Sequence, residues 1–108
     1  MPVTIGKVDT FPNVQPTKQQ VLKIGEECME VFSAWENLCK KSTGEEFCTN
    51  DCQHMPYCSL THKLVDECAD VIHAVSNLLD ALGVDDMREA MQECKERNVE
   101  RGRFETRE

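Results

Sequence analysis

Four acidic residues with the spacing of metal ligands occur at two places in the chain. Glu27 and Glu30 are three residues apart, and Glu67 and Asp70 repeat this spacing 40 residues later. Acids three residues apart lie on one side of a helix, and carboxylate oxygens are the ligands that Mg²⁺ and Mn²⁺ prefer. If two such helices pack together, four like charges converge and need a cation to neutralise them. The spacing therefore predicts a Mg²⁺ site at which Mn²⁺ can substitute.

The acids belong to a longer internal repeat. Residues 23–31 (KIGEECMEV) align with residues 63–71 (KLVDECADV) at an offset of 40 positions. The match continues in three further pairs: Ala34/Ala74, Asn37/Asn77 and Leu38/Leu78. The acids lie beside the apolar positions both times, and a solvated surface gives no reason for that repetition. The alternative, an ordinary solvated acidic rim, stays open at this point, but the repeat favours metal ligation.

Three helices are predicted to position these acids. Apolar residues recur at intervals of three and four over residues 17–41 and again over 60–82, and Gly83 follows as a suitable helix end. A shorter amphipathic helix over 86–98 begins with a capping box that starts at Asp86. Because no stretch alternates as a β-strand does, we expect an all-α helical bundle with two long antiparallel acidic helices and a third amphipathic helix.

The remaining segments complete a single domain over residues 1–108. Three prolines in residues 1–16 predict an extended lead-in. Residues 42–59 form a cysteine-rich insert that we expect to be a loop or a short helix, and residues 99–108 form a charged tail with a basic RGR segment.

Composition excludes several classes of partner. The chain has 20 acidic and 12 basic residues and a net charge of −8, which argues against binding to nucleic acid or to an anionic membrane. No apolar run approaches the roughly 20 residues of a membrane helix, and no secretion signal is visible at the N-terminus. We expect a cytoplasmic protein. A short chain with wide apolar faces buries them best against a second copy, so we also expect a homodimer or a dimer-based tetramer.

With these motifs, the sequence resembles the MazG-like nucleoside triphosphate pyrophosphohydrolases of the all-α NTP pyrophosphatase superfamily. Residues 26–30 form an EExxE motif and residues 67–70 an ExxD motif. Residues 95–104 (KERNVERGRF) resemble the family's downstream K-x-x-N-x-x-R-G-R segment. The resemblance covers residues 17–104 and includes three separated motifs in the family's order.

The resemblance implies Mg²⁺-dependent hydrolysis between the α- and β-phosphates of a nucleoside triphosphate, which yields the monophosphate and pyrophosphate. It implies that the metal ligands are Glu27, Glu30, Glu67 and Asp70. Glu27 is thereby also catalytic, and Glu26 supports the site or positions the attacking water. On the substrate side, it implies that Lys95, Asn98 and Arg101 face the triphosphate. Lys23 is a further phosphate candidate, although its spacing also fits an ordinary helical ion pair with Glu27.

Two alternatives remain at the level of the sequence. Residues 23–27 and the region around Ile72 and His73 also resemble phosphoribosyl-ATP pyrophosphohydrolase of histidine biosynthesis, which does not usually carry the RGRF tail. The 36 residues between Glu30 and Glu67 exceed the usual linker of the MazG-like family. The chain could instead be a non-enzymatic helical binding module, with its acids on a solvated rim and a zinc-stapled loop.

The cysteines raise the question of zinc. Four of them, with two nearby histidines, could form a structural Zn²⁺ site: Cys39, Cys48, Cys52 and Cys58, with His54 and His62. Their spacing lacks paired C-x₂-C knuckles, so a loop of reduced thiols is the alternative.

Other side chains have structural interpretations. We expect Trp35 in the core, with stacking on a nucleobase as the alternative, and Cys28 and Cys68 as small apolar residues of the helical stripes. We expect His73 at the surface.

Overall fold

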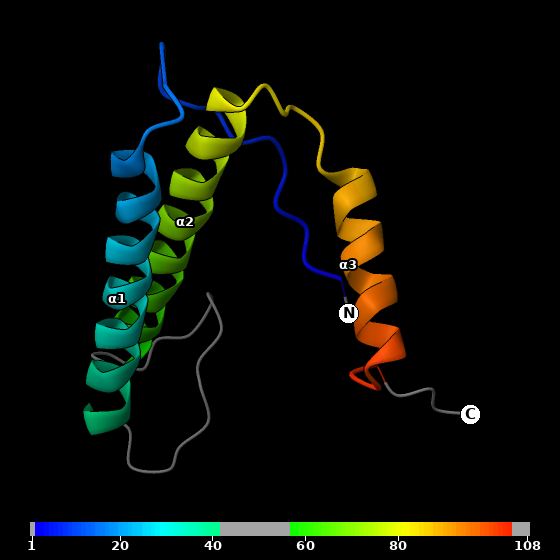
Figure 1. The fold of residues 1–108 in the computed structure, drawn as a ribbon. Helices are drawn as coiled ribbons and strands as arrows, with labels where there is room; N and C mark the ends of the chain where they lie inside the picture. The colour runs from blue at the N-terminus through cyan, green and yellow to red at the C-terminus, as the bar shows by residue number, and fades with distance from the viewer. Residues whose placement is uncertain (1, 42–56, 105–108) are drawn as a thin grey trace.

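A computed structural model describes residues 2–41 and 57–104, and in this part of the chain the regular structure is entirely helical. The helices are α1 (Lys18–Lys41), α2 (Tyr57–Ala81) and α3 (Arg88–Glu100). Figure 1 shows α1 and α2 side by side and antiparallel, with α3 standing apart from them. The all-α class and the antiparallel pair of long helices are therefore confirmed. The segment 42–56, which holds most of the predicted insert, lies outside the described residues.

Small apolar residues form the contact between α1 and α2. Ala34 and Ala74, which are equivalent in the internal repeat, are both buried, and Leu38 is 1% exposed. Alanines at the contact let the two helices approach closely, which brings the acidic positions one and two turns away near each other. The core of the described residues is therefore narrow, and it lies beside the predicted metal ligands.

The helix ends follow local sequence signals in part. At the end of α2, Gly83 has φ of 81°, and the amides of Gly83 and Val84 bond to the carbonyls of Asp80 and Leu79 at 2.9 Å each, a Schellman arrangement. This confirms the predicted stop.

The capping box predicted for the start of α3 is wrong. Met87 is the N-cap and forms no side-chain capping bond. Asp86 instead accepts from the backbone and guanidinium nitrogens of Arg88, at distances from 2.7 to 3.2 Å. The short link to Arg88 therefore replaces the expected pairing with Glu89.

Residues 2–16, here called the N-terminal strap, contain no regular helix, and Figure 1 shows them passing the later end of α2 before the start of α1. The extended lead-in expected over residues 1–16 stays a prediction. Three hydrogen bonds hold the strap to α2: His73 Nε2 to the Asp9 carbonyl (3.1 Å), Thr10 Oγ1 to Asp80 Oδ2 (2.8 Å) and the Phe11 amide to Asn77 Oδ1 (2.9 Å). Because the acceptors and donors on α2 lie three or four residues apart, they share one face of that helix.

Helix α3 does not join a three-helix bundle within one chain. In the part of the chain that the structure describes, α3 makes no packing contact with α1 or α2 and buries none of its residues. Met91 on its expected apolar face is 58% exposed. A third helix is confirmed, but the bundle packing expected for it is not found among the described residues of one chain.

Several apolar side chains of the helical pair also remain uncovered. Trp35 is 43% exposed, and Cys28 and Cys68 are exposed thiols, so none of the three occupies the core position expected for it. The apolar faces were predicted correctly as helical stripes, but the contact between two helices covers only the central part of each stripe. None of the described helices has the length and apolar character needed to cross a membrane.

Candidate metal centre

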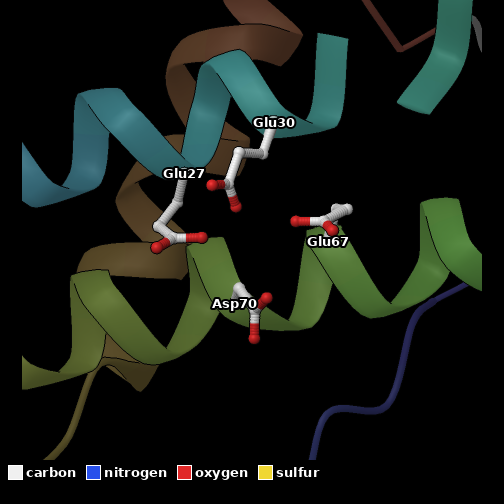
Figure 2. A group of neighbouring side chains, drawn as sticks. All are labelled: Glu27, Glu30, Glu67 and Asp70. Carbon is white, nitrogen blue, oxygen red and sulfur yellow. The ribbon is translucent and has the colours of Figure 1, made fainter. Parts of the chain in front are cut away.

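The four predicted ligands come together between α1 and α2, and they are called here the acid cluster. Glu27 and Glu30 belong to α1, and Glu67 and Asp70 to α2. One carboxylate oxygen from each lies within 4.8 Å of the others. In Figure 2, Glu27 and Glu30 extend from α1 toward α2, and Glu67 points toward them from the opposite helix. This geometry allows all four side chains to share a cation.

The two halves of the cluster are built in the same way. Glu27 and Glu67 are equivalent in the repeat, and each is 7% exposed. Lys23 Nζ lies 2.9 Å from Glu27 Oε1, and Lys63 Nζ lies 2.7 Å from Glu67 Oε1. Each lysine stands one helical turn before its acid, so it fixes one carboxylate oxygen and leaves the second free to face the neighbouring acids.

One oxygen of the cluster lacks a partner. Glu67 Oε2 is buried and accepts no hydrogen bond from the described residues, although the other oxygen of the same carboxylate is paired with Lys63. A buried carboxylate oxygen without a donor is costly, and such an atom in a native site calls for a ligand, an ion or a proton. The donor set around it is carboxylate only, which suits a hard divalent cation.

The pKa values of three acids in the cluster shift in opposite directions. The hydrogen bond from Lys23 lowers the pKa of Glu27, and the bond from Lys63 lowers the pKa of Glu67. The pKa of Glu30 is raised, first because its protonated carboxyl can donate to Glu67, and next because it can donate to Glu27. Without a cation, the cluster therefore favours two charged acids flanking one that tends to keep a proton.

Two grooves flank the acid cluster, and the internal repeat relates them. The strap groove, of about 470 Å³, lies between the first half of α1 and the second half of α2 and includes Phe11 of the strap. The second groove, of about 160 Å³, lies between the second half of α1 and the first half of α2. Every residue lining the second groove has a counterpart 40 positions away in the strap groove: Leu60/Gln20, Lys63/Lys23, Glu67/Glu27, Glu30/Asp70, Ser33/His73, Ala34/Ala74 and Asn37/Asn77.

Two further predicted site residues, Lys23 and Glu26, lie on α1 near the acid cluster but do not belong to it. Lys23 lies in the strap groove beside Glu27, as either of its two predicted roles requires. Glu26 lies outside the acid cluster with a side chain that is 68% exposed, and it is 3.8 Å from Lys23.

The substrate residues predicted on the third helix and tail lie away from the cluster within one chain. Lys95 and Asn98 belong to α3 and Arg101 follows it, and α3 does not contact α1 or α2. Asn98 has a local role: it donates to the Cys94 carbonyl at 3.0 Å and accepts from Arg103 at 2.9 Å. It thereby fixes the turn that follows α3.

The predicted zinc ligands fall largely outside the described residues. Cys48, Cys52 and His54 lie in the segment 42–56, and the side chain of Cys58 is likewise outside the described part. Cys39 is an exposed free thiol near the end of α1. The zinc prediction therefore stays a prediction.

Sequence reasoning missed the contribution of the strap. Phe11 contacts the ring of His73 edge to face, with centroids 4.7 Å apart and planes at 81°. His73, expected at the surface, is half-buried by this contact. One sequence signal could have located the grooves. The repeat retains an asparagine in both halves, and Asn37 and Asn77 line the two grooves at equivalent positions.

Comparisons with protein-family models, curated proteins and solved structures found no match to this chain.

Proposed function

We propose that the protein is a Mg²⁺-dependent nucleoside triphosphate pyrophosphohydrolase of the MazG-like type. The observation that carries this proposal is the acid cluster: four carboxylates from two helices within 4.8 Å, one of them with a buried oxygen that has no donor among the described residues. The order of the EExxE, ExxD and KxxNxxRGR motifs supports the same assignment.

The charge of the cluster selects the kind of substrate. A nucleoside triphosphate carries about four negative charges, so bare carboxylates would repel it, whereas carboxylates that hold cations would attract it. Bound Mg²⁺ supplies charge neutralisation at phosphate and an activated water. Glu27 and Glu67, held in place by their lysines, provide rigid ligands on the two sides. Glu26 is retained as a candidate for positioning water, since it neighbours Glu27 without belonging to the cluster.

We further propose that the protein works as a homodimer in which α3 of one copy approaches the acid cluster of the other. The motivation is the number of large apolar side chains that stay exposed on the helical pair in the described part of the chain, since exposed apolar patches often mark interaction surfaces. Large residues exposed by more than half include Val21, Leu22, Met29, Phe32 and Val65. A second copy would cover this surface and could bring Lys95 and Arg101 to the phosphates. Light scattering on the purified chain tests this: a monomer at micromolar concentration would contradict it.

The activity is tested by measuring pyrophosphate release from a panel of common and modified nucleoside triphosphates and phosphoribosyl-ATP, with and without Mg²⁺. We expect cleavage that requires Mg²⁺ and is lost in Glu67→Gln. Glu36→Gln, an exposed acid on α1 outside the cluster, is the matched control and should keep wild-type turnover. Circular dichroism should show unchanged helical content in both variants.

Each contrary result has a distinct meaning. Cleavage of phosphoribosyl-ATP alone would select the histidine-biosynthesis alternative. If no substrate is cleaved and Mg²⁺ does not raise the melting temperature, the proposal fails and the helical binding module becomes the better account.

A further inference from the structure

The helical pair alone offers two equivalent places for the part of a substrate that extends beyond its phosphates. Because the repeat relates the two grooves residue by residue, each adjoins the acid cluster through two of its acids. Glu27 and Asp70 border the strap groove, and Glu30 and Glu67 border the second groove. A group bound to the cluster could therefore extend to either side, and something other than the repeat must decide between them.

The N-terminal strap removes this equivalence. It bonds to α2 and brings Phe11 into one groove, where the ring meets His73 and yet Phe11 remains 61% exposed. Ser33 stands at the position equivalent to His73, so the second groove lacks an aromatic side chain among the described residues that line it. An exposed aromatic ring in a groove is a stacking surface for another planar ring.

Size and polar groups favour the same groove. Its volume of about 470 Å³ lies within the range of small-molecule sites, whereas the second groove, at about 160 Å³, is below it. Gln19 and Gln20 place amide groups in the strap groove, and amides both donate and accept hydrogen bonds as the edge of a nucleobase requires.

We propose that the strap groove holds the nucleobase of the substrate, stacked on Phe11, while the phosphates would lie at a cation held by the acid cluster, on the side of Glu27 and Asp70. This inference rests on the proposed function and adds to it that a segment outside the helical pair makes the base-binding surface. The strap is held at residues 9 and 11 by main-chain atoms, so changing the side chain of Phe11 leaves those bonds in place.

The kinetic test compares Phe11→Ala and Phe11→Trp with the wild type. Loss of stacking should raise the KM for the best nucleoside triphosphate by roughly 5- to 150-fold in Phe11→Ala, and Phe11→Trp should restore it. Inhibition by inorganic tripolyphosphate, which has the phosphates but no ring, should change less than about twofold if stacking acts on the ring alone. Val3→Ala, at a strap residue that is 85% exposed and lies outside both grooves, is the control and should keep the wild-type KM. An unchanged KM, or equal loss for nucleotide and tripolyphosphate, would overturn the inference.

A binding test separates this inference from the proposed function. Nucleoside monophosphates, added in the presence of Mg²⁺ to the wild-type protein, should shift the NMR signals of the Phe11 ring and the Asn77 side-chain amide, and should bind more weakly to Phe11→Ala. These shifts in a protein that cleaves no triphosphate would retain the base site and reject the enzyme. Nucleotide binding without any change at Phe11, or no nucleotide binding at all, would reject the base site.

Discussion

Glu27 and Glu67 are the same position of a duplicated helix, and each is buried with one carboxylate oxygen bound to a lysine one turn earlier. The antiparallel packing of the two copies turns this sequence repeat into a nearly symmetric site. Glu30 and Asp70 complete it from the next turn of each helix. The acids converge because the alanines of the same repeat let the helices approach beside them.

Removing one ligand charge should weaken metal binding without unfolding the protein. Asp70→Asn keeps the side-chain volume and removes a charged oxygen, so we expect affinity for Mn²⁺ to fall at least about tenfold. Electron paramagnetic resonance of free Mn²⁺ measures this directly. Asp66→Asn changes an exposed acid on the same helix outside the cluster and should bind Mn²⁺ as the wild type does.

The metal-free protein should show an unusual titration at Glu30. Its pKa is raised above the ordinary 4.5 by the bonds its protonated form can make to Glu67 and Glu27. A raised pKa stabilises the fold at pH below about 4.5, and this contribution is lost as the pH rises through the folded-state value. Carbon NMR of the carboxyl groups should place Glu30 above 4.5 and Glu27 and Glu67 below it.

The same electrostatics predict the effect of a neutral substitute at that position. Glu30→Gln carries an amide that can donate as the protonated acid does, so it should raise the melting temperature of the metal-free protein at pH 7. A Glu30 that titrates at or below the ordinary value, together with a lower melting temperature in the variant, would contradict this account.

The two repeated asparagines should differ in their contribution to stability. Asn77 is 4% exposed and accepts from the Phe11 amide, so Asn77→Ala removes the acceptor of a partly buried donor and should cost about 1–3 kcal/mol in urea unfolding. Asn37→Ala, at the equivalent and exposed position of α1, should cost less than about 0.5 kcal/mol. Equal costs would mean that the strap bond does not stabilise the fold.

The narrow core should make Leu38 unusually important. It is 1% exposed, and Leu38→Ala leaves a cavity at the contact between α1 and α2, so we expect a loss of about 2–5 kcal/mol. Urea unfolding followed by circular dichroism measures the change. Val3→Ala, at a strap residue that is 85% exposed, should stay within about 0.5 kcal/mol of the wild type.

The helices and the acid cluster could be predicted because their signals are local and repeated. Val31, Leu38 and their apolar neighbours recur with the period of a helix and so predict the buried face of that helix. The duplicated acids stand at the same edge of this face in both helices, which predicts that they meet when the faces pack together. The attachment of the strap to α2 could not be predicted, since two of its three bonds use main-chain atoms of Asp9 and Phe11 that leave no pattern in the sequence. The position of α3 also escaped prediction, because its apolar residues find no cover within the described part of one chain.

Main-chain hydrogen bonds hold the strap to α2, so substitutions in the strap during evolution need not detach it. Backbone bonds at residues 9 and 11 tolerate almost any side chain, so residue 11 can mutate without loosening the segment that carries it. If the strap groove binds a nucleobase as proposed, a single substitution at residue 11 would change the preferred base, while the four carboxylates between the two helices stay unchanged.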